Sequence, residues 1–241
     1  PGAGGHHDPT YAAMIYSVDE SVGRVVAKLE ELKLADNTLV IFTSDNGGML
    51  NHEGSAAWQA GHRLSGEHFG FKFDAWEGGH RVPLIVRWPG VIAPGRTSEA
   101  LVGQVDLMAT LADAVGCALP DDAAEDSFDQ LPVWRGERES VRDYLVHNTY
   151  AKKWGVRRGD WLLLAQQDGY HNRTPQWAHD RYPANASEVF LCDVKQDLEQ
   201  RQDVSAAHPD VVAELQQLLA DLRHRGHSAP RLAASATEAE K

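Results

Sequence analysis

The sequence predicts an α/β fold followed by a small antiparallel sheet that a C-terminal helix covers. An amphipathic helical pattern over residues 10–34 leads into the apolar run at residues 39–42, and a helix followed by a buried strand is the unit of an α/β layer. Beyond residue 140, this alternation gives way to short runs typical of strands. We therefore expect two structural parts within the 241 residues.

Composition excludes several functional classes. The net charge of -12 argues against a nucleic-acid partner or an anionic membrane surface, because both require clustered Lys and Arg. The two cysteines, Cys117 and Cys192, suggest neither a disulfide framework nor a zinc site, and we expect both to be packed thiols. No apolar stretch approaches the roughly 20 residues of a membrane span. The chain starts at Pro1 without Met, which indicates a piece of a longer protein.

The first helix should begin at Asp8 and Pro9, because Asp caps free amides and Pro suits the first helical turn. Its apolar residues recur every three or four positions, so we expect them to pack into the core: Tyr11, Ile15, Val18, Val22, Val25, Leu29 and Leu32. The run at residues 39–42 lacks polar alternation. It is therefore predicted to be buried on both faces, as in the middle of a parallel sheet.

Asp45, Asn46, Gly47 and Gly48 directly follow this strand. Open α/β sheets commonly bind ligands at the carboxyl ends of their strands. Carboxylate and amide oxygens suit a hard cation such as Ca²⁺ or Mg²⁺ better than zinc. Asp-Asn-Gly is equally typical of a simple turn, so a metal site and a turn remain equal alternatives on this stretch alone.

The following segment, residues 48–70, shows no helical or strand period and contains three histidines, His52, His62 and His68. Because it leaves the strand end that carries Asp45, we interpret it as lining a pocket, although each single histidine is more often a surface loop residue. Next come a short strand at residues 82–88, a helix at residues 104–115 and an acidic, solvated linker at residues 120–140.

The C-terminal part is predicted to contain four strands, at residues 144–149, 154–157, 161–165 and 189–193. Arg158-Gly159-Asp160 joins the middle two as a hairpin. A helix at residues 209–223 carries one apolar stripe that should cover the sheet, made of Val212, Leu215, Leu218, Leu219 and Leu222. The tail from Gly226 has little to bury and is expected to be disordered.

Lys72 lies between Phe71 and Phe73, an unusual setting for a charge that only needs water. Such a lysine suits a bound anion, although a surface lysine with a buried stem is the favoured interpretation when the segment is taken alone. Glu77 and Arg81, around two glycines, are spaced for an ion pair that would hold a turn.

Taken together, these stretches closely resemble the formylglycine-dependent sulfatases. The resemblance runs in order through residues 11–23 (YAAMIYSVDESVG), 34–38 (LADNT), 43–47 (TSDNG), Lys72 with 77–83 (EGGHRVP), 88–90 (WPG), 105–111 (VDLMATL) and 189–193 (VFLCD). It covers nearly the whole chain. It implies the C-terminal part of an alkaline-phosphatase-like α/β catalytic domain at residues 1–119, the linker at 120–140, an α+β subdomain at 141–225 and a tail at 226–241.

The resemblance also implies roles for individual residues. Asp45 and Asn46 match the family's metal ligands, usually for Ca²⁺ with Mg²⁺ or Mn²⁺ as alternatives, and Asp45 also lies beside the nucleophile. Lys72 matches the lysine that contacts the sulfate group and assists the departing oxygen. His80, and His147 in the C-terminal part, are further candidates for substrate contact. The implied substrate is a sulfated small molecule or carbohydrate.

Part of the family's site has no match in this chain. The formylglycine nucleophile arises from a Cys/Ser-x-Pro-x-Arg motif, which neither Cys117 nor Cys192 begins. We therefore expect this chain alone to be inactive, with the nucleophile in a missing N-terminal part. The alternatives are a phosphate or phosphonate ester hydrolase of the same superfamily and an inactive, sulfatase-like binding module. By family resemblance alone, a periplasmic or secreted location is favoured.

Overall fold

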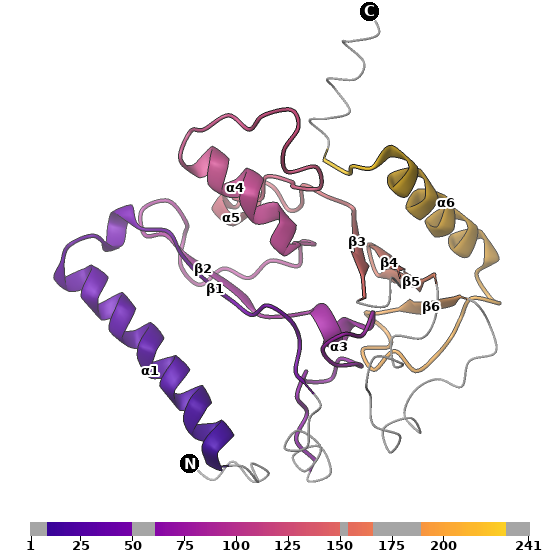
Figure 1. Cartoon of the computed structure of the whole chain (residues 1–241), viewed down its shortest axis with the longest axis horizontal. Coiled ribbons are helices and arrows are strands. Elements are labelled where there is room, and N and C mark those ends of the chain that lie inside the picture. Colours follow the sequence, from indigo (N-terminus) through magenta and orange to yellow (C-terminus); the bar gives the residue numbers. More distant parts are fainter. Residues whose placement is uncertain (1–8, 50–60, 150–153, 166–188, 230–241) are drawn as a thin grey trace, which may run out of the picture.

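A computed structural model describes residues 9–49, 61–149, 154–165 and 189–229 of the protein. Figure 1 shows α1 at one side of the molecule and the four-stranded sheet with α6 at the other. The first elements are α1 (Pro9–Glu31), the 3₁₀ helix η1 (Ala35–Asn37), β1 (Val40–Thr43), α3 (Glu77–His80) and β2 (Leu84–Arg87). The mixed α/β fold class predicted from the sequence is confirmed.

β1 and β2 form a two-stranded antiparallel sheet, with Val40 opposite Arg87 and Thr43 opposite Leu84. The expectation of a parallel arrangement, with β1 buried on both faces, is wrong for the described residues, because every residue of β1 is only partly buried. β2 runs antiparallel beside β1, a pairing that needs no crossover connection. The carboxyl end of β1 therefore lies beside the start of β2.

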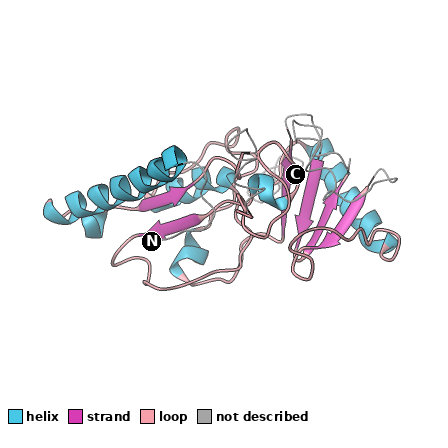
Figure 2. Ribbon diagram, turned by 90° about the horizontal axis from the view of Figure 1, so that it is seen from below, coloured by secondary structure: helices cyan, strands magenta, loops and turns pink. Residues whose placement is uncertain are grey.

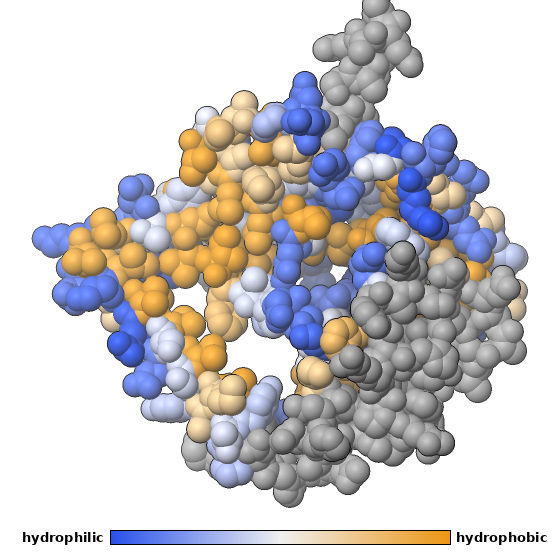
Figure 3. All heavy atoms as spheres, viewed as in Figure 1, coloured by the Kyte–Doolittle hydropathy of each residue, from blue (hydrophilic) through white to orange (hydrophobic). Residues whose placement is uncertain are grey.

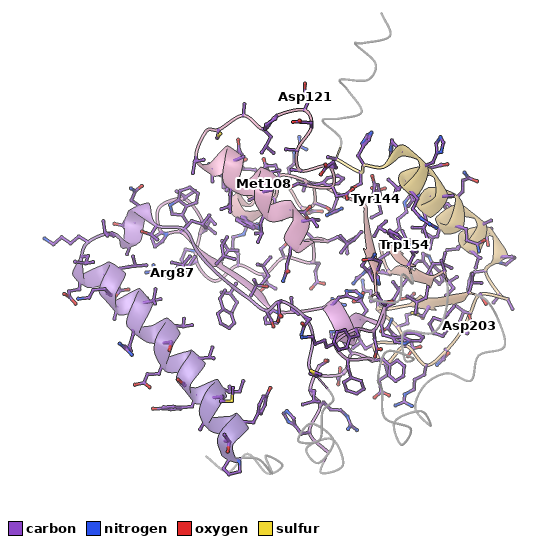
Figure 4. The ribbon with its side chains drawn as sticks, viewed as in Figure 1. Arg87, Met108, Asp121, Tyr144, Trp154 and Asp203 are labelled. Carbon is purple, nitrogen blue, oxygen red and sulfur yellow. The ribbon has the colours of Figure 1, made fainter. Side chains whose placement is uncertain are left out.

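The apolar stripe of α1 also differs from expectation. No residue of α1 is buried, and Ile15, Val18 and Val25 are 53%, 47% and 56% exposed. The predicted core packing of this stripe is therefore not found among the described residues. Figure 3 shows that hydrophobic residues also gather over β1, β2 and α4, where Ile85 and Met108 are exposed, and Figure 4 shows Met108 on α4.

The middle of the chain contains η2 (Gln104–Asp106), α4 (Leu107–Ala114) and α5 (Leu131–Arg135), so the predicted helix at residues 104–115 is confirmed. Asp106 is fully buried, accepts hydrogen bonds from the backbone amides of Gly103 and Phe128, and pairs with Arg142 at 2.6 Å. These contacts fold the acidic segment back onto α4. Residues 127–133, placed in a solvated linker by the sequence, are therefore packed rather than solvated.

The C-terminal sheet contains β3 (Tyr144–Asn148), β4 (Trp154–Arg158), β5 (Trp161–Leu164) and β6 (Phe190–Asp193), antiparallel throughout in the order β3-β4-β5-β6. All four predicted strands are confirmed. Gly159 turns the hairpin between β4 and β5 with a φ of +57°, which glycine adopts without strain. Figure 2 shows the four strands side by side, with helix on one side of them.

Each face of this sheet is covered by a different part of the chain. On one face, Val156, Leu163 and Leu191 pack with Leu215 and Leu219 of α6 (Pro209–Arg225), as the sequence predicted. On the other face, residues of β5 and β6 pack with Phe69, Ala75 and Trp76, which surround Lys72 in the sequence: Leu162, Leu164, Phe190 and Cys192. The Lys72 segment is therefore built onto the C-terminal sheet.

Two smaller expectations need correction. Cys117, expected to be a packed thiol, is exposed, whereas Cys192 is buried. Residues 226–229, assigned to a disordered tail, are ordered: Ala229 is buried, and its amide donates to the Glu125 carbonyl at 2.8 Å. The rest of the predicted tail, 230–241, lies outside the described residues, and within those residues no helix has the length and apolar character of a membrane span.

Candidate functional site

The segment after β1 is held against the Lys72 segment by two backbone hydrogen bonds. The Gly47 amide donates to the Gly79 carbonyl at 2.9 Å, and the Lys72 amide donates to the Gly48 carbonyl at 2.8 Å. Asp45 and Asn46 therefore lie immediately before the residues that contact both α3 and Lys72. The structure brings the two predicted motifs together at the end of β1.

Glycine at position 47 is required by this close approach. A Cβ atom on Gly47 would lie 1.8 Å from the carbonyl oxygen of Gly78, which no real side chain can do. Gly78 is equally confined, because its own Cβ would lie 2.5 Å from the carbonyl oxygens of Phe69 and Gly70. The sequence suggested that these glycines allow sharp turns, but the structure shows that they let two backbones touch.

Lys72 occupies the corner of a tight turn. The Asp74 amide donates to the Phe71 carbonyl at 2.9 Å, while the buried Asp74 carboxylate accepts the Phe71 amide at 2.9 Å. Phe73 has a φ of +84°, a strained value for a non-glycine residue that this turn imposes. The Lys72 ammonium lies 5.4 Å from the Phe73 ring centroid and forms no ion pair with another described residue. The turn therefore presents a positive charge that pairs with no carboxylate among the described residues.

Glu77, the first residue of α3, is a buried carboxylate with two cationic partners. It is 2% exposed, and its Oε2 accepts Arg81 at 2.7 Å and Arg157 of β4 at 2.9 Å. Its backbone amide donates to the Oε1 of Gln200 at 2.9 Å. The ion pair predicted between Glu77 and Arg81 is confirmed, and the contacts to Arg157 and Gln200 attach α3 to the C-terminal sheet.

The rings of His80 and His147 lie against each other, next to the backbone carbonyl of Ala75. Their ring centroids are 3.8 Å apart, and their Nε2 atoms lie 3.3 Å and 2.8 Å from the same carbonyl oxygen, that of Ala75. Burial lowers the pKa of His80 to about 4 and that of His147 to about 3. Both rings are therefore neutral near pH 7, and a carbonyl partner requires the proton on Nε2. Their predicted contact with substrate stays a prediction.

The other predicted pocket histidines are only partly placed. His68 lies near Arg81 and Arg157, and its pKa is lowered by burial and by the Arg81 charge. His62 is also in the described part of the chain, whereas His52 lies outside the described residues. His68 is thereby associated with Glu77 and its two arginine partners.

Asp45 and Asn46 have the chemistry of metal ligands but do not complete a site. The exposed Asp45 carboxylate has no hydrogen bond to another described residue. The Asn46 amide nitrogen donates to the Gly47 carbonyl at 2.9 Å, and its amide oxygen accepts no hydrogen bond from the described part of the chain. Ca²⁺ takes about six to eight oxygen ligands. No group of three acidic, His or Cys residues suited to a metal occurs in the described ranges. The two residues fit a hard cation as part of a larger ligand set.

The sequence did not point to Arg157, Gln200 or the Ala75 carbonyl. Arg157 contacts Glu77 across 80 residues, and Gln200 does so across 123 residues. Neither residue belongs to a recognisable motif or periodic pattern. Each is a polar residue in a strand or after one, with nothing in the neighbouring sequence to indicate its distant partner. The one available signal was the resemblance at residues 189–193, which placed the C-terminal sheet in the same family unit as Lys72.

Two family models match the chain. A model described as "Sulfatase" matches residues 4–117, and one described as "N-sulphoglucosamine sulphohydrolase, C-terminal" matches residues 66–225. Among curated proteins, the N-acetylgalactosamine-6-O-sulfatase of Bacteroides thetaiotaomicron is 33% identical over 223 residues, covering 90% of this chain and 42% of that protein. The steryl-sulfatase of Rattus norvegicus is 39% identical over 138 residues, covering 57% of this chain and 24% of that protein.

Solved structures agree with these matches. A structure from a study of glycosaminoglycan metabolism by Bacteroides thetaiotaomicron has a TM-score of 0.73 and 31% identity, covering 86% of this chain and 43% of that chain. Another structure, in complex with its substrate D-glucosamine-2-N,6-O-disulfate, has a TM-score of 0.64 and 25% identity. The match covers 89% of this chain and 40% of that chain. The phosphonate monoester hydrolase of Agrobacterium radiobacter shares the fold, with a TM-score of 0.58 and 22% identity. The match covers 89% of this chain and 40% of that chain. The chain thus spans less than half the length of these proteins.

Proposed function

Because this chain belongs to the sulfatase family, we propose that it supplies the Lys72 half of an active site that hydrolyses a sulfate ester of a carbohydrate. One observation carries the proposal: the hydrogen bond from the Lys72 amide to the Gly48 carbonyl holds the lysine turn against the end of β1, next to Asp45 and Asn46. The backbone of the lysine turn is thereby tied to the strand end that precedes the two proposed oxygen ligands, and this supports the proposal.

This arrangement suits the charge changes of sulfate ester hydrolysis. Negative charge develops on the sulfuryl oxygens and on the departing oxygen, so a fixed ammonium group stabilises the transition state more than the ground state. Lys72 is well placed for this task because it has no ion-pair partner among the described residues and its turn is fixed by Asp74. We assign Lys72 to sulfate binding and to stabilisation of the leaving oxygen.

Asp45 and Asn46 are proposed to hold a divalent cation, Ca²⁺ in preference to Mg²⁺ or Mn²⁺, together with ligands from outside this chain. When bound, such an ion neutralises charge on the sulfate group as a Lewis acid. Formylglycine is proposed as the nucleophile, also from outside the described residues. Within this chain, Asp45 and Asn46 would hold the cation, and Lys72 would contact the sulfate group.

The proposed substrate class rests on the relatives. The most similar curated proteins include an N-acetylgalactosamine-6-O-sulfatase, and one solved relative holds a disulfated glucosamine. Steryl-sulfatases match a shorter part of the chain, 57% against 90%. A 6-O-sulfated N-acetylhexosamine is therefore the first substrate to test, with a steroid sulfate as the comparison.

The test measures sulfate release by the full-length gene product. Lys72→Ala should lower kcat by about 100- to 1,000-fold, as for other lost transition-state donors. Asp45→Ala and Asn46→Ala should each weaken activation by Ca²⁺, measured by titration after chelation. Lys195→Ala and Asp122→Asn remove exposed charges far along the chain from these motifs and serve as matched controls with unchanged kcat.

Three results would contradict the proposal. Wild-type activity in Lys72→Ala would exclude the assigned role of that lysine. Hydrolysis of phosphate or phosphonate esters with no sulfate release would favour the related hydrolases that share the fold. Binding of the sulfated sugar with no hydrolysis of any ester, in a preparation that contains formylglycine, would indicate a binding module.

A further inference from the structure

The turn that carries Lys72 rests on the C-terminal sheet rather than on the α/β part of the chain. Phe69, Ala75 and Trp76, on both sides of Lys72, pack into one hydrophobic cluster with Leu162, Leu164, Phe190, Cys192 and Val194. Trp76 is fully buried there, with its ring centroid 4.7 Å from that of Phe190. This apolar contact fixes the base of the segment.

A side chain of the sheet also makes a polar contact with the segment next to Lys72. His147 of β3 reaches the carbonyl oxygen of Ala75 at 2.8 Å, three residues beyond Lys72. A carbonyl oxygen only accepts, so the Nε2 of His147 is the donor. Its other ring nitrogen, Nδ1, is buried and has no hydrogen-bond partner in the described part of the chain. The ring therefore makes one directed polar contact, and that contact is to the lysine turn.

The neighbouring strand is shaped to admit this ring. Gly155 of β4 lies directly opposite His147 in the sheet, and a Cβ atom on Gly155 would be 2.4 Å from the His147 Nε2. The φ of Gly155 is not positive, so backbone conformation does not require glycine at this position. The missing side chain instead leaves the space that the imidazole occupies on its way to Ala75.

From this geometry we infer that His147 is a positioning residue for catalysis: by holding the Ala75 carbonyl, it fixes the turn that aims Lys72 at the sulfate group. The inference rests on the proposed function for its catalytic consequence but not for the structural coupling. It assigns a role in the site to the C-terminal sheet. His80, 3.3 Å from the same oxygen, makes the longer and weaker contact.

Two substitutions test the role from different directions. His147→Ala removes the donor, and Gly155→Ala keeps the imidazole but displaces it. His147→Gln keeps an N–H donor and is the conservative variant. The matched control is His208→Ala, since His208 also packs against the sheet, with its ring centroid 4.9 Å from that of Trp161, but contacts the sheet away from the Lys72 turn. All four are made in the full-length gene product.

The first measurement is amide hydrogen exchange, which needs no activity. His147→Ala and Gly155→Ala should each accelerate exchange at least tenfold at Lys72 and Asp74, whose amides donate within this turn and to Gly48. The amides of β5 and β6 should keep wild-type rates, and so should Lys72 in His208→Ala and His147→Gln. Wild-type exchange at Lys72 in His147→Ala, or equal acceleration in His208→Ala, would overturn the inference.

The second measurement separates kcat from KM. Misplacement of Lys72 by about 1 Å should lower kcat by about 100-fold with KM nearly unchanged. His147→Gln should recover most of this loss, whereas a merely structural role predicts equal losses for His147→Ala and His208→Ala at equal thermal stability. If wild-type protein hydrolyses no sulfate ester, the proposed function fails, and the exchange result still decides whether His147 holds the turn.

Discussion

Substitution of Gly47 by alanine is the sharpest perturbation of the proposed site. The new Cβ would lie 1.8 Å from the Gly78 carbonyl oxygen, whereas real Cβ atoms essentially never come within 3.0 Å of such an atom, so the two segments must separate by about 1.2 Å. That movement breaks the 2.9 Å hydrogen bond from the Gly47 amide to Gly79. It also shifts Asp45 and Asn46 relative to Lys72.

A displacement of this size should cost about 100-fold in kcat, equivalent to about 2.7 kcal/mol of transition-state stabilisation. Overpacking adds a stability loss of about 1–3 kcal/mol. Sulfate release and urea unfolding, measured on the same full-length preparations, separate the two effects. Gly23→Ala, whose Cβ meets nothing within 4 Å, is the control and should keep wild-type kcat. Wild-type turnover in Gly47→Ala would refute the claim that the contact between these backbones sets the site geometry.

Two further predictions concern stability. Asp106→Asn should destabilise the protein by about 3–5 kcal/mol in urea unfolding, because it leaves the buried Arg142 guanidinium, 2% exposed, without a countercharge; a loss below about 1 kcal/mol would contradict this. His80 and His147 have folded-state pKa values of about 4 and about 3, below the unfolded value of 6.5, so the unfolded chain binds more protons as the pH falls. The free energy of unfolding should therefore decrease from pH 6.5 towards pH 4, by up to about 1.4 kcal/mol per pH unit for each ring. In His147→Gln this slope should be smaller by the contribution of one histidine. An unchanged slope would show that His147 is not neutral in the folded state.

The elements with strong local signals were predictable from the sequence. The apolar residues of the helix predicted at 209–223 recur with the helical period. Three of them, Leu215, Leu219 and Leu222, are buried in α6. The C-terminal strands were identified because β-branched and aromatic runs are bounded by turn residues. Asp45, Asn46 and Lys72 were proposed as site residues because they fall within specific motifs. The structure joins the backbones of those motifs through Gly48, and the roles of the three side chains stay a prediction.

The sequence-based predictions that failed were those that depend on contacts between residues far apart in the chain. The run at residues 39–42 has the composition of a strand buried on both faces, but burial depends on neighbours that local sequence does not identify, and β1 has β2 as its strand partner in the described ranges. The apolar residues of α1 were likewise predicted to be buried, but the sequence does not identify which element would cover them. Acidic residues around 121–126 suggested a solvated linker. The residues that follow them are packed, because the Phe128 amide and the Gln130 side chain donate hydrogen bonds to the Asp106 carboxylate. Arg157 and Gln200 carry no local pattern at all.

The dependence of the Lys72 turn on the C-terminal sheet has a consequence for biosynthesis. Gln200, which accepts the Glu77 amide, follows it by 123 residues, and at about 5–20 residues per second a ribosome needs on the order of ten seconds to add them. During that interval Trp76 and Phe69 lack the surface that later buries them. The nascent protein therefore completes the packing around the Lys72 turn only after β6 has left the exit tunnel, and a chaperone that shields aromatic residues at this stage would act on the segment around Lys72.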